Sequence, residues 1–86
     1  MAEVRILYFA WLRERAGRGE EALTLPPDVA TVGALMDWLG RRDPALAEAF
    51  AMRRVVRAAV NQNFASAETP VAAGDEVAFF PPVTGG

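Results

Sequence analysis

Glu76-Val77-Ala78-Phe79-Phe80 decides the fold, because in an extended chain this run places apolar side chains on both faces. A strand that is apolar on both faces is typical of the centre of a sheet. We therefore predict that residues 76–80 form the central strand and that at most one of Phe79 and Phe80 faces a covering helix. Gly74-Asp75 predicts the turn before this strand, and Pro81-Pro82 predicts its end because proline has no backbone N–H to donate.

The rest of the sheet is predicted from three earlier segments that are rich in β-branched, aromatic or alternating apolar residues. They are residues 4–9 (VRILYF), residues 22–25 (ALTL) and residues 55–60 (VVRAAV), the last followed by a turn at 61–63 and a short partner strand at 64–65. The first two strands are expected to pair antiparallel. Leu23 and Leu25 lie two residues apart and should face the core together.

Three helices are predicted between the strands. The principal helix begins after Thr31, whose hydroxyl can cap it. Its apolar residues recur at helical spacing and are Val32, Leu35, Met36 and Leu39. A first helix over residues 11–16 should end at Gly17, and a shorter third helix should begin at Asp43-Pro44.

This order of elements predicts a single α+β domain in which a mixed sheet wraps on one principal helix. The ubiquitin-like β-grasp is the smallest common fold with this order. No repeat or long linker divides the chain. We expect the domain over residues 1–80 and an extended C-terminal tail over residues 81–86.

The composition argues against several classes of function. Of the 86 residues, 52% are hydrophobic and 23% are charged, so a packed core is expected. Because the chain has no Cys and no His, neither a metal site nor a self-contained hydrolase site is expected. The nine basic residues are scattered arginines and the net charge is −2, which argues against nucleic-acid binding. With no bilayer-spanning apolar run and no signal peptide, a cytoplasmic protein without a membrane partner is expected.

The last six residues, Pro81 to Gly86, are predicted to project from the domain. The prolines stiffen the base of this tail and the glycines thin its tip. Six extended residues reach roughly 20 Å, enough to carry a terminal carboxylate into a deep site of another protein. A carboxylate is a poor electrophile, so chemistry at Gly86 needs an activation such as adenylation, which implies ATP and a second protein. By itself, a Gly-Gly end is also compatible with an ordinary frayed terminus.

These segments resemble a known family. Residues 75–86 (DEVAFFPPVTGG), preceded by residues 58–62 (AAVNQ) and by residues 7–10 (LYFA) with Arg13-Glu14, are closely similar to the small subunits of molybdopterin synthase, also called molybdopterin-converting factor subunit 1. The resemblance extends over the whole chain and is most specific at the C-terminal end. It implies a β-grasp sulfur carrier.

The resemblance also implies a reaction cycle. An E1-like enzyme adenylates the terminal glycine with ATP, and the glycine is then converted to a thiocarboxylate. The carrier inserts its tail into the large catalytic subunit of molybdopterin synthase, in a heterotetramer of two small and two large subunits, and delivers sulfur to cyclic pyranopterin monophosphate. Catalysis is expected in the large subunit, and no cofactor is expected to be bound tightly by the carrier, since a thiocarboxylate sulfur is itself a nucleophile.

Individual residues take roles from the same resemblance. Gly86 is the covalent attachment site, Gly85 lets the tip thread, and the residues held by partners are Pro81, Pro82, Val83 and Thr84. Arg13, Phe64 and Phe80 lie where the family presents its partner-binding face. From the residues alone, Phe64 and Phe80 are as compatible with the core, and Arg13 with a solvated helix face.

Three other functions are compatible with the sequence. Sulfur carriers of the thiamin type or of tRNA thiolation share the fold and the Gly-Gly end. A ubiquitin-like protein modifier is a second alternative, although the chain has no Lys to receive another copy of itself. The third is an interaction module whose tail has no function. The sulfur donor cannot be inferred from the sequence.

Overall fold

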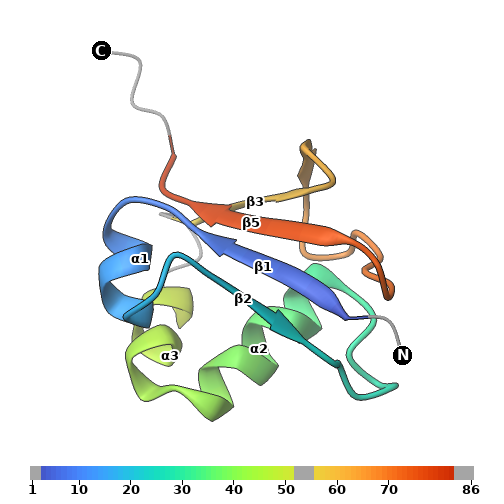
Figure 1. Ribbon diagram of the computed structural model, residues 1–86, viewed down its shortest axis with the longest axis horizontal. Helices are drawn as coiled ribbons and strands as arrows, with labels where there is room; N and C mark the ends of the chain where they lie inside the picture. The colour runs from blue at the N-terminus through green and yellow to red at the C-terminus, as the bar shows by residue number, and fades with distance from the viewer. Residues whose placement is uncertain (1–2, 52–55, 83–86) are drawn as a thin grey trace.

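The computed structural model describes residues 3–51 and 56–82. Within these ranges the elements are β1 (Val4–Tyr8), α1 (Trp11–Ala16), β2 (Glu20–Leu23), α2 (Val32–Arg42), α3 (Pro44–Ala51), β3 (Arg57–Val60), β4 (Asn63–Ala65) and β5 (Glu76–Phe80). Figure 1 shows one sheet with the helices packed on one side of it. The α+β layers predicted from the sequence are confirmed.

β5 lies in the middle of the sheet, whose strand order is β2-β1-β5-β3-β4. It runs parallel to β1 and antiparallel to β3. The remaining pairs, β1 with β2 and β3 with β4, are antiparallel. The last strand in the sequence therefore joins two antiparallel pairs into the mixed sheet of a β-grasp fold, as its two apolar faces predicted.

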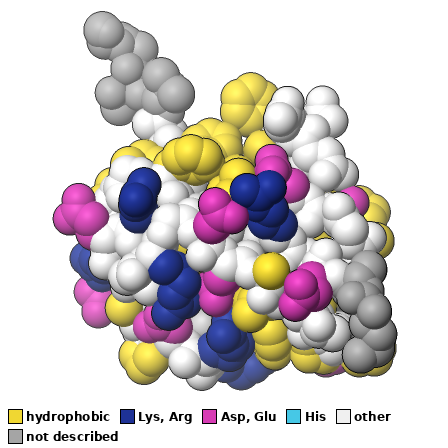
Figure 2. Space-filling model, viewed as in Figure 1, with side chains coloured by type: hydrophobic (Ala, Val, Ile, Leu, Met, Phe, Trp, Pro, Cys, Tyr) yellow, Lys and Arg dark blue, Asp and Glu magenta, His cyan; other side chains and the backbone are white. Residues whose placement is uncertain are grey.

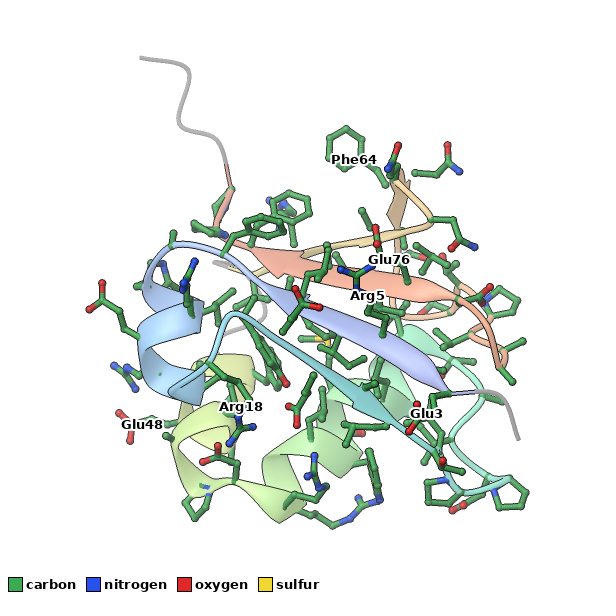
Figure 3. The ribbon with its side chains drawn as sticks, in the orientation of Figure 1. Glu3, Arg5, Arg18, Glu48, Phe64 and Glu76 are labelled. Carbon is green, nitrogen blue, oxygen red and sulfur yellow. The ribbon has the colours of Figure 1, made fainter. Side chains whose placement is uncertain are left out.

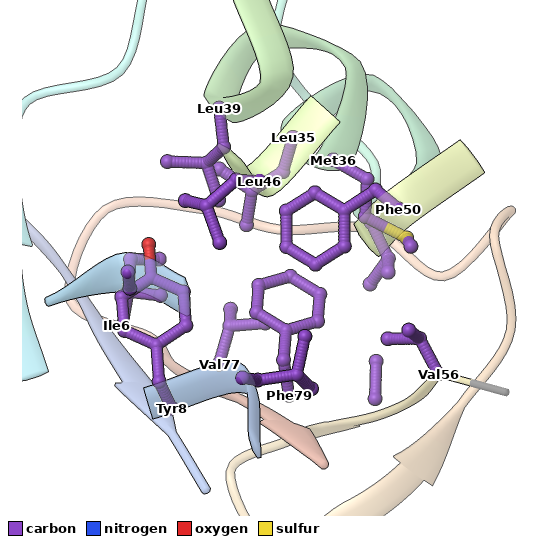
Figure 4. Close-up of a cluster of buried hydrophobic side chains, with 14 of the residues drawn as sticks. Ile6, Tyr8, Leu35, Met36, Leu39, Leu46, Phe50, Val56, Val77 and Phe79 are labelled. Atoms are coloured by element: carbon purple, nitrogen blue, oxygen red, sulfur yellow. The ribbon is translucent and has the colours of Figure 1, made fainter. Parts of the chain in front are cut away.

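The core lies between the sheet and the helices, and alternate strand residues point into it. The buried residues of the two central strands β1 and β5 are Val4, Ile6, Tyr8, Val77 and Phe79. The ring of Phe79 lies 5.0 Å from the ring of Phe50 in α3 and 6.3 Å from that of Tyr8, between centroids (Figure 4). Because Phe79 points inward, Phe80 belongs to the opposite face, which confirms the expected division of the pair.

The helix boundaries follow the predicted capping residues. The Thr31 hydroxyl accepts a hydrogen bond from the Ala34 N–H at 3.2 Å, and the Asp43 carboxylate accepts one from the Ala45 N–H at 3.0 Å. Each satisfies an N–H group that has no partner within its helix. Gly17 follows α1 with a φ of 76°, a conformation that glycine adopts without a steric penalty.

β2 spans Glu20–Leu23 and so lies two residues earlier than predicted. It ends at Leu23 because this residue already pairs with the first residue of β1. It begins in the acidic pair because Glu21 has a partner there: its carboxylate accepts a hydrogen bond from the Tyr8 hydroxyl at 2.7 Å. Burial, and then this hydrogen bond, raise the pKa of Tyr8, so its hydroxyl remains a donor. Leu23 and Leu25 both pack against the core, as expected.

β3 spans Arg57–Val60 and is shorter than the predicted 55–60. Arg57 pairs with Phe80, the last residue of β5. Pro81 follows and has no N–H, so the ladder cannot continue past this pair. Val55, the first residue of the predicted strand, lies outside the described residues.

The turn after β3 is tied to the turn before β5 by side-chain hydrogen bonds. Asn61, at a φ of 50°, donates from its amide to Asp75 Oδ1 at 3.0 Å and accepts from the Glu76 N–H at 3.0 Å. Asp75 Oδ2 accepts from the Ala72 N–H at 2.8 Å. The hydrogen bond from Ala72, followed by that from Asn61, lowers the pKa of Asp75 below its ordinary value.

We expect Asp75 to make the fold less stable in acid. Because its pKa is lower in the folded chain, the carboxylate stabilises the fold fully above the unfolded-state pKa of about 3.9, and this contribution is lost as the pH falls through the folded-state pKa. Urea unfolding at neutral pH and at about pH 3 should therefore show a smaller difference between the unmodified chain and Asp75→Asn in acid. Asn61→Ala, which removes one donor, should reduce the pH dependence in part. An Asp75→Asn difference that is the same at both pH values would contradict the prediction.

Candidate functional site

The helices that the structure describes lie on one side of the sheet and leave its outer face open (Figure 1). The cross-strand register places Leu7 of β1 opposite Ala78 of β5, Ala78 opposite Ala59 of β3, and Ala59 opposite Phe64 of β4. These four residues form an apolar row across four strands. A row of this kind on an open sheet face is a candidate contact surface for another protein.

The row ends in Phe64, whose ring lies beside that of Phe80 at the end of β5. Phe64 is 87% exposed, and its ring centroid lies 6.1 Å from that of Phe80. Figure 3 shows the Phe64 side chain projecting away from the body of the molecule. Phe64, Phe80 and Pro82, which we call the aromatic patch, line an open hollow of about 410 Å³ together with Arg57. An exposed ring, Phe64, and a half-buried ring, Phe80, beside an arginine have the composition that binding hot spots favour.

Charged residues occupy the other end of the outer face. Arg5 of β1 lies between Glu20 of β2 and Glu76 of β5, with guanidinium-to-carboxylate distances of 3.1 Å and 3.8 Å (Figure 3). Figure 2 shows hydrophobic side chains gathered above these charges in the same view. The outer face is therefore apolar toward the C-terminal end of β5 and ion-paired toward its start.

Arg13 lies in a second hollow, apart from the aromatic patch. This hollow of about 420 Å³ is formed at the junction of β1 and α1, and its lining includes Phe9, Ala10, Arg13 and Glu20. Phe9 is 49% exposed and Arg13 is exposed on α1. Ala10 has a φ of 55° and a ψ of −135°, a strained backbone conformation for a residue other than glycine that turns the chain from β1 into α1.

The sequence-predicted site residues are thus brought together only in part. Phe64 and Phe80 form one patch, whereas Arg13 belongs to the neighbouring hollow, and the arginine beside the two rings is Arg57. Sequence reasoning missed Arg57 and Phe9. Both residues could have been found from the alternation of inward and outward side chains along β1 and β3. Residues that alternate with the buried positions of a strand point to the opposite face of the sheet.

The aromatic patch adjoins the start of the tail. Phe80 ends β5, and Pro81 and Pro82 follow it, both half-buried. The predicted roles of Val83, Thr84, Gly85 and Gly86 fall on residues outside the described ranges. Any protein that covers the aromatic patch therefore contacts the base of the tail.

Few of the described residues have side chains whose pKa values differ from the ordinary ones. Tyr8 and Asp75 are the described residues with shifted pKa values; burial, and then a hydrogen bond to Glu21, raises the pKa of Tyr8, and hydrogen bonds from Ala72 and Asn61 lower the pKa of Asp75. Within residues 3–51 and 56–82, no group of three His, Cys, Asp or Glu side chains is arranged to hold a metal ion.

A hollow of about 490 Å³ between α2 and α3 lies in the helical layer, on the other side of the sheet from the aromatic patch. Over residues 3–51 and 56–82, no helix is long and apolar enough to cross a membrane.

Comparison with known proteins gives matches over nearly the whole chain. The sequence profile of the ThiS family matches residues 6–86. A molybdopterin synthase sulfur carrier subunit of Escherichia coli is 41% identical over 83 residues, which cover 96% of this chain and 99% of that protein.

Solved structures share the fold. A putative molybdopterin converting factor subunit 1 from Pyrococcus furiosus superposes with a TM-score of 0.78 at 32% identity, covering 96% of this chain and all of that chain. SAMP1, a small archaeal modifier protein, from Haloferax volcanii also superposes with a TM-score of 0.78, at 34% identity over 98% of this chain and 99% of that chain.

Proposed function

The chain belongs to the ThiS family, and from this premise we propose that it is the sulfur carrier subunit of molybdopterin synthase. The observation that carries the proposal is the match to sulfur carrier subunits over 96% of the chain, together with an open apolar face that leads from β5 to the base of the tail. The Gly85-Gly86 end of the sequence supplies the carboxylate that such a carrier needs.

The proposed chemistry takes place at the Gly86 carboxylate and balances in three steps. A carboxylate oxygen attacks the α-phosphate of ATP in an E1-like enzyme, and pyrophosphate leaves. A sulfide equivalent then attacks the acyl carbon, so a C–S bond forms as AMP departs. In the large subunit the thiocarboxylate sulfur attacks a carbon of cyclic pyranopterin monophosphate and displaces an oxygen substituent from that carbon. Water then attacks the acyl carbon and cleaves its C–S bond, so the Gly86 carboxylate is restored and the sulfur stays on the pterin as a thiolate.

The outer face of the sheet is the proposed docking surface for the large subunit. A carrier must hold its tail at the mouth of the partner's active site, and the aromatic patch includes Pro82, the second residue of the tail. Burying exposed aromatic rings at such a contact supplies binding free energy, because apolar surface leaves water. The proposed assembly is a cytoplasmic heterotetramer of two small and two large subunits, in which the large subunit provides the catalytic groups.

Intact-mass analysis tests the carrier function. Protein incubated with the E1-like enzyme, ATP and a sulfide source should gain the mass difference between one sulfur and one oxygen atom, and fragmentation should place it at Gly86. A matched reaction without ATP should leave the mass unchanged, since the carboxylate is not activated. Persistent absence of the heavier species under complete conditions would refute the carrier function.

A ubiquitin-like protein modifier is the second candidate, and the similarity to SAMP1 favours it. The two functions share the activated terminus but differ in the acceptor, which is an amine for a modifier and sulfide for a carrier. Because this chain has no Lys, any isopeptide conjugate must form on another protein. Conjugates that depend on ATP and on Gly86, without production of molybdopterin, would support the modifier function instead.

A further inference from the structure

We propose that the free carrier pairs with a second copy of itself through the aromatic patch, and that this self-association competes with docking to the large subunit. The pairing follows from the shape and polarity of the patch. The competition rests on the proposed function, because it takes the outer face to be the docking surface.

The aromatic patch carries a projection and a hollow side by side. Phe64 is 87% exposed, and its side chain points away from the body of the molecule (Figure 3). The hollow beside it measures about 410 Å³, and its lining includes Phe80, Pro82 and Arg57. A cavity of about 150 Å³ is enough to hold benzene, so this hollow has room for the ring of a phenylalanine. An aromatic side chain of another molecule therefore fits there.

A second copy of the chain both supplies such a side chain and receives one. In an isologous dimer the same patch of both copies meets across a two-fold axis. The Phe64 ring of each copy then enters the hollow of the other, and every contact occurs twice. Among the described residues, the exposed large hydrophobic side chains are those of Phe9 and Phe64, and Phe64 is the more exposed. Seating two such rings removes apolar surface from water, which favours pairing.

The charges of the outer face permit this contact. Glu20 and Glu76 are both paired with Arg5 within the chain, at 3.1 Å and 3.8 Å. The net charge of each copy is −2, and physiological salt screens exposed charges beyond about 8 Å. Arg57 lines the hollow, and a guanidinium is attracted to the face of an aromatic ring placed against it. The pairing is therefore mainly apolar in origin and should depend little on salt.

The small size of the aromatic patch makes the pair weak. A stable interface usually buries about 800 Å² on each partner, whereas the patch consists of three side chains. By mass action, such a pair forms at high carrier concentration and separates when a tighter partner is present. Because the patch includes Pro82, pairing covers the base of the tail. A carrier within the pair cannot use the same surface to dock.

Sedimentation velocity of the isolated chain, from micromolar to millimolar concentration, tests the self-association. The sedimentation coefficient should rise with concentration. Phe64→Ala removes both seated rings of a pair and should raise the self-dissociation constant at least about thirtyfold. Phe9→Ala is the matched control, because Phe9 is exposed but lines the other hollow, and it should self-associate normally. Circular dichroism of both variants should match that of the unmodified chain.

Isotope-filtered nuclear magnetic resonance locates the contact and tests the competition. In a mixture of labelled and unlabelled copies, the ring protons of Phe64 should show intermolecular Overhauser effects to Phe80 and Pro82. Adding the large subunit should remove these effects as the carrier leaves the pair. Intermolecular effects that persist at saturation with the large subunit would overturn the competition, because the pair would then leave the docking surface open.

The possible outcomes separate this proposal from the proposed function. A chain that stays monomeric up to millimolar concentration would refute the self-association and leave the carrier function standing. Self-association that Phe64→Ala does not weaken, or that Phe9→Ala weakens equally, would show that the aromatic patch is not where the copies meet. If the chain pairs through the patch but does not bind the large subunit, the proposed docking fails while the self-association stands.

Discussion

Deleting Gly86, or adding one alanine after it, is expected to abolish sulfur transfer while the domain still folds. Deletion draws the carboxylate back by about 3.3–3.6 Å, and an added residue pushes it forward by the same distance. Misplacing reacting atoms by about 1 Å can cost a hundredfold in rate, so the loss should be at least about a hundredfold. The measurement is the formation of molybdopterin from cyclic pyranopterin monophosphate with the E1-like enzyme, ATP, a sulfide source and the large subunit.

A chain with one alanine added at its N-terminus is the matched control for this prediction. It carries the same extra mass, far in sequence from Gly86, and should retain full sulfur transfer. Measuring the thiocarboxylate and the pterin product separately shows whether the altered tail fails to reach the active site of the E1-like enzyme or that of the large subunit. Full product formation by the C-terminally extended chain would contradict the role of Gly86 as the transferring residue.

Much of the fold could be predicted because local signals agree with the tertiary structure. Thr31 and Asp43 cap the helices that follow them, because their side-chain oxygens accept hydrogen bonds from N–H groups in the first turn. Gly17 ends the first helix, because glycine adopts the left-handed conformation that a helix end requires. The position of β5 could be predicted from its composition, since apolar residues on both faces of a strand are typical of the centre of a sheet.

The strand boundaries could not be predicted from local signals, because a strand extends only as far as its neighbour. β2 starts in an acidic pair because Glu21 receives hydrogen bonds from Tyr8 and Arg18, and both contacts require the folded chain. β3 starts at Arg57 because its partner Phe80 is followed by proline. The partner residues of a strand depend on its register with the neighbouring strand, and the sequence of one strand alone does not determine that register.

The types of residue in the candidate site could be predicted from the sequence, but their arrangement in the folded chain could not. Whether Phe64 faces the core or water depends on which face of the sheet the helices cover, and the period of a short strand does not reveal this. Nor does sequence spacing reveal that Arg57 is the arginine beside the two rings. This relation arises from cross-strand register. The assignment of partner-binding roles to Arg13, Phe64 and Phe80 stays a prediction that binding measurements must test.

Replacing the rings of the aromatic patch should weaken docking by about ten- to a hundredfold. Phe64 exposes 87% of its surface in the isolated chain, so its ring contributes little to the core and has a large apolar area to bury against a partner. Truncation of a central aromatic at an interface typically costs about 2 kcal/mol or more. Phe64→Ala should therefore raise the dissociation constant for the large subunit about thirtyfold while leaving the unfolding free energy nearly unchanged, and Phe80→Ala should add a smaller loss.

Calorimetric titration against the large subunit measures this effect, with urea unfolding of each variant to check its stability. Gln62→Ala is the matched control, because Gln62 is exposed near the same strand but lies outside the aromatic patch. The result also bears on catalysis, since the patch includes Pro82 at the base of the tail. A carrier that docks poorly should need a higher concentration to reach the same rate of sulfur transfer, whereas its rate at saturation should be preserved if the tail still reaches the active site. Unchanged affinity of Phe64→Ala would contradict the prediction that the aromatic patch is the centre of the docking surface.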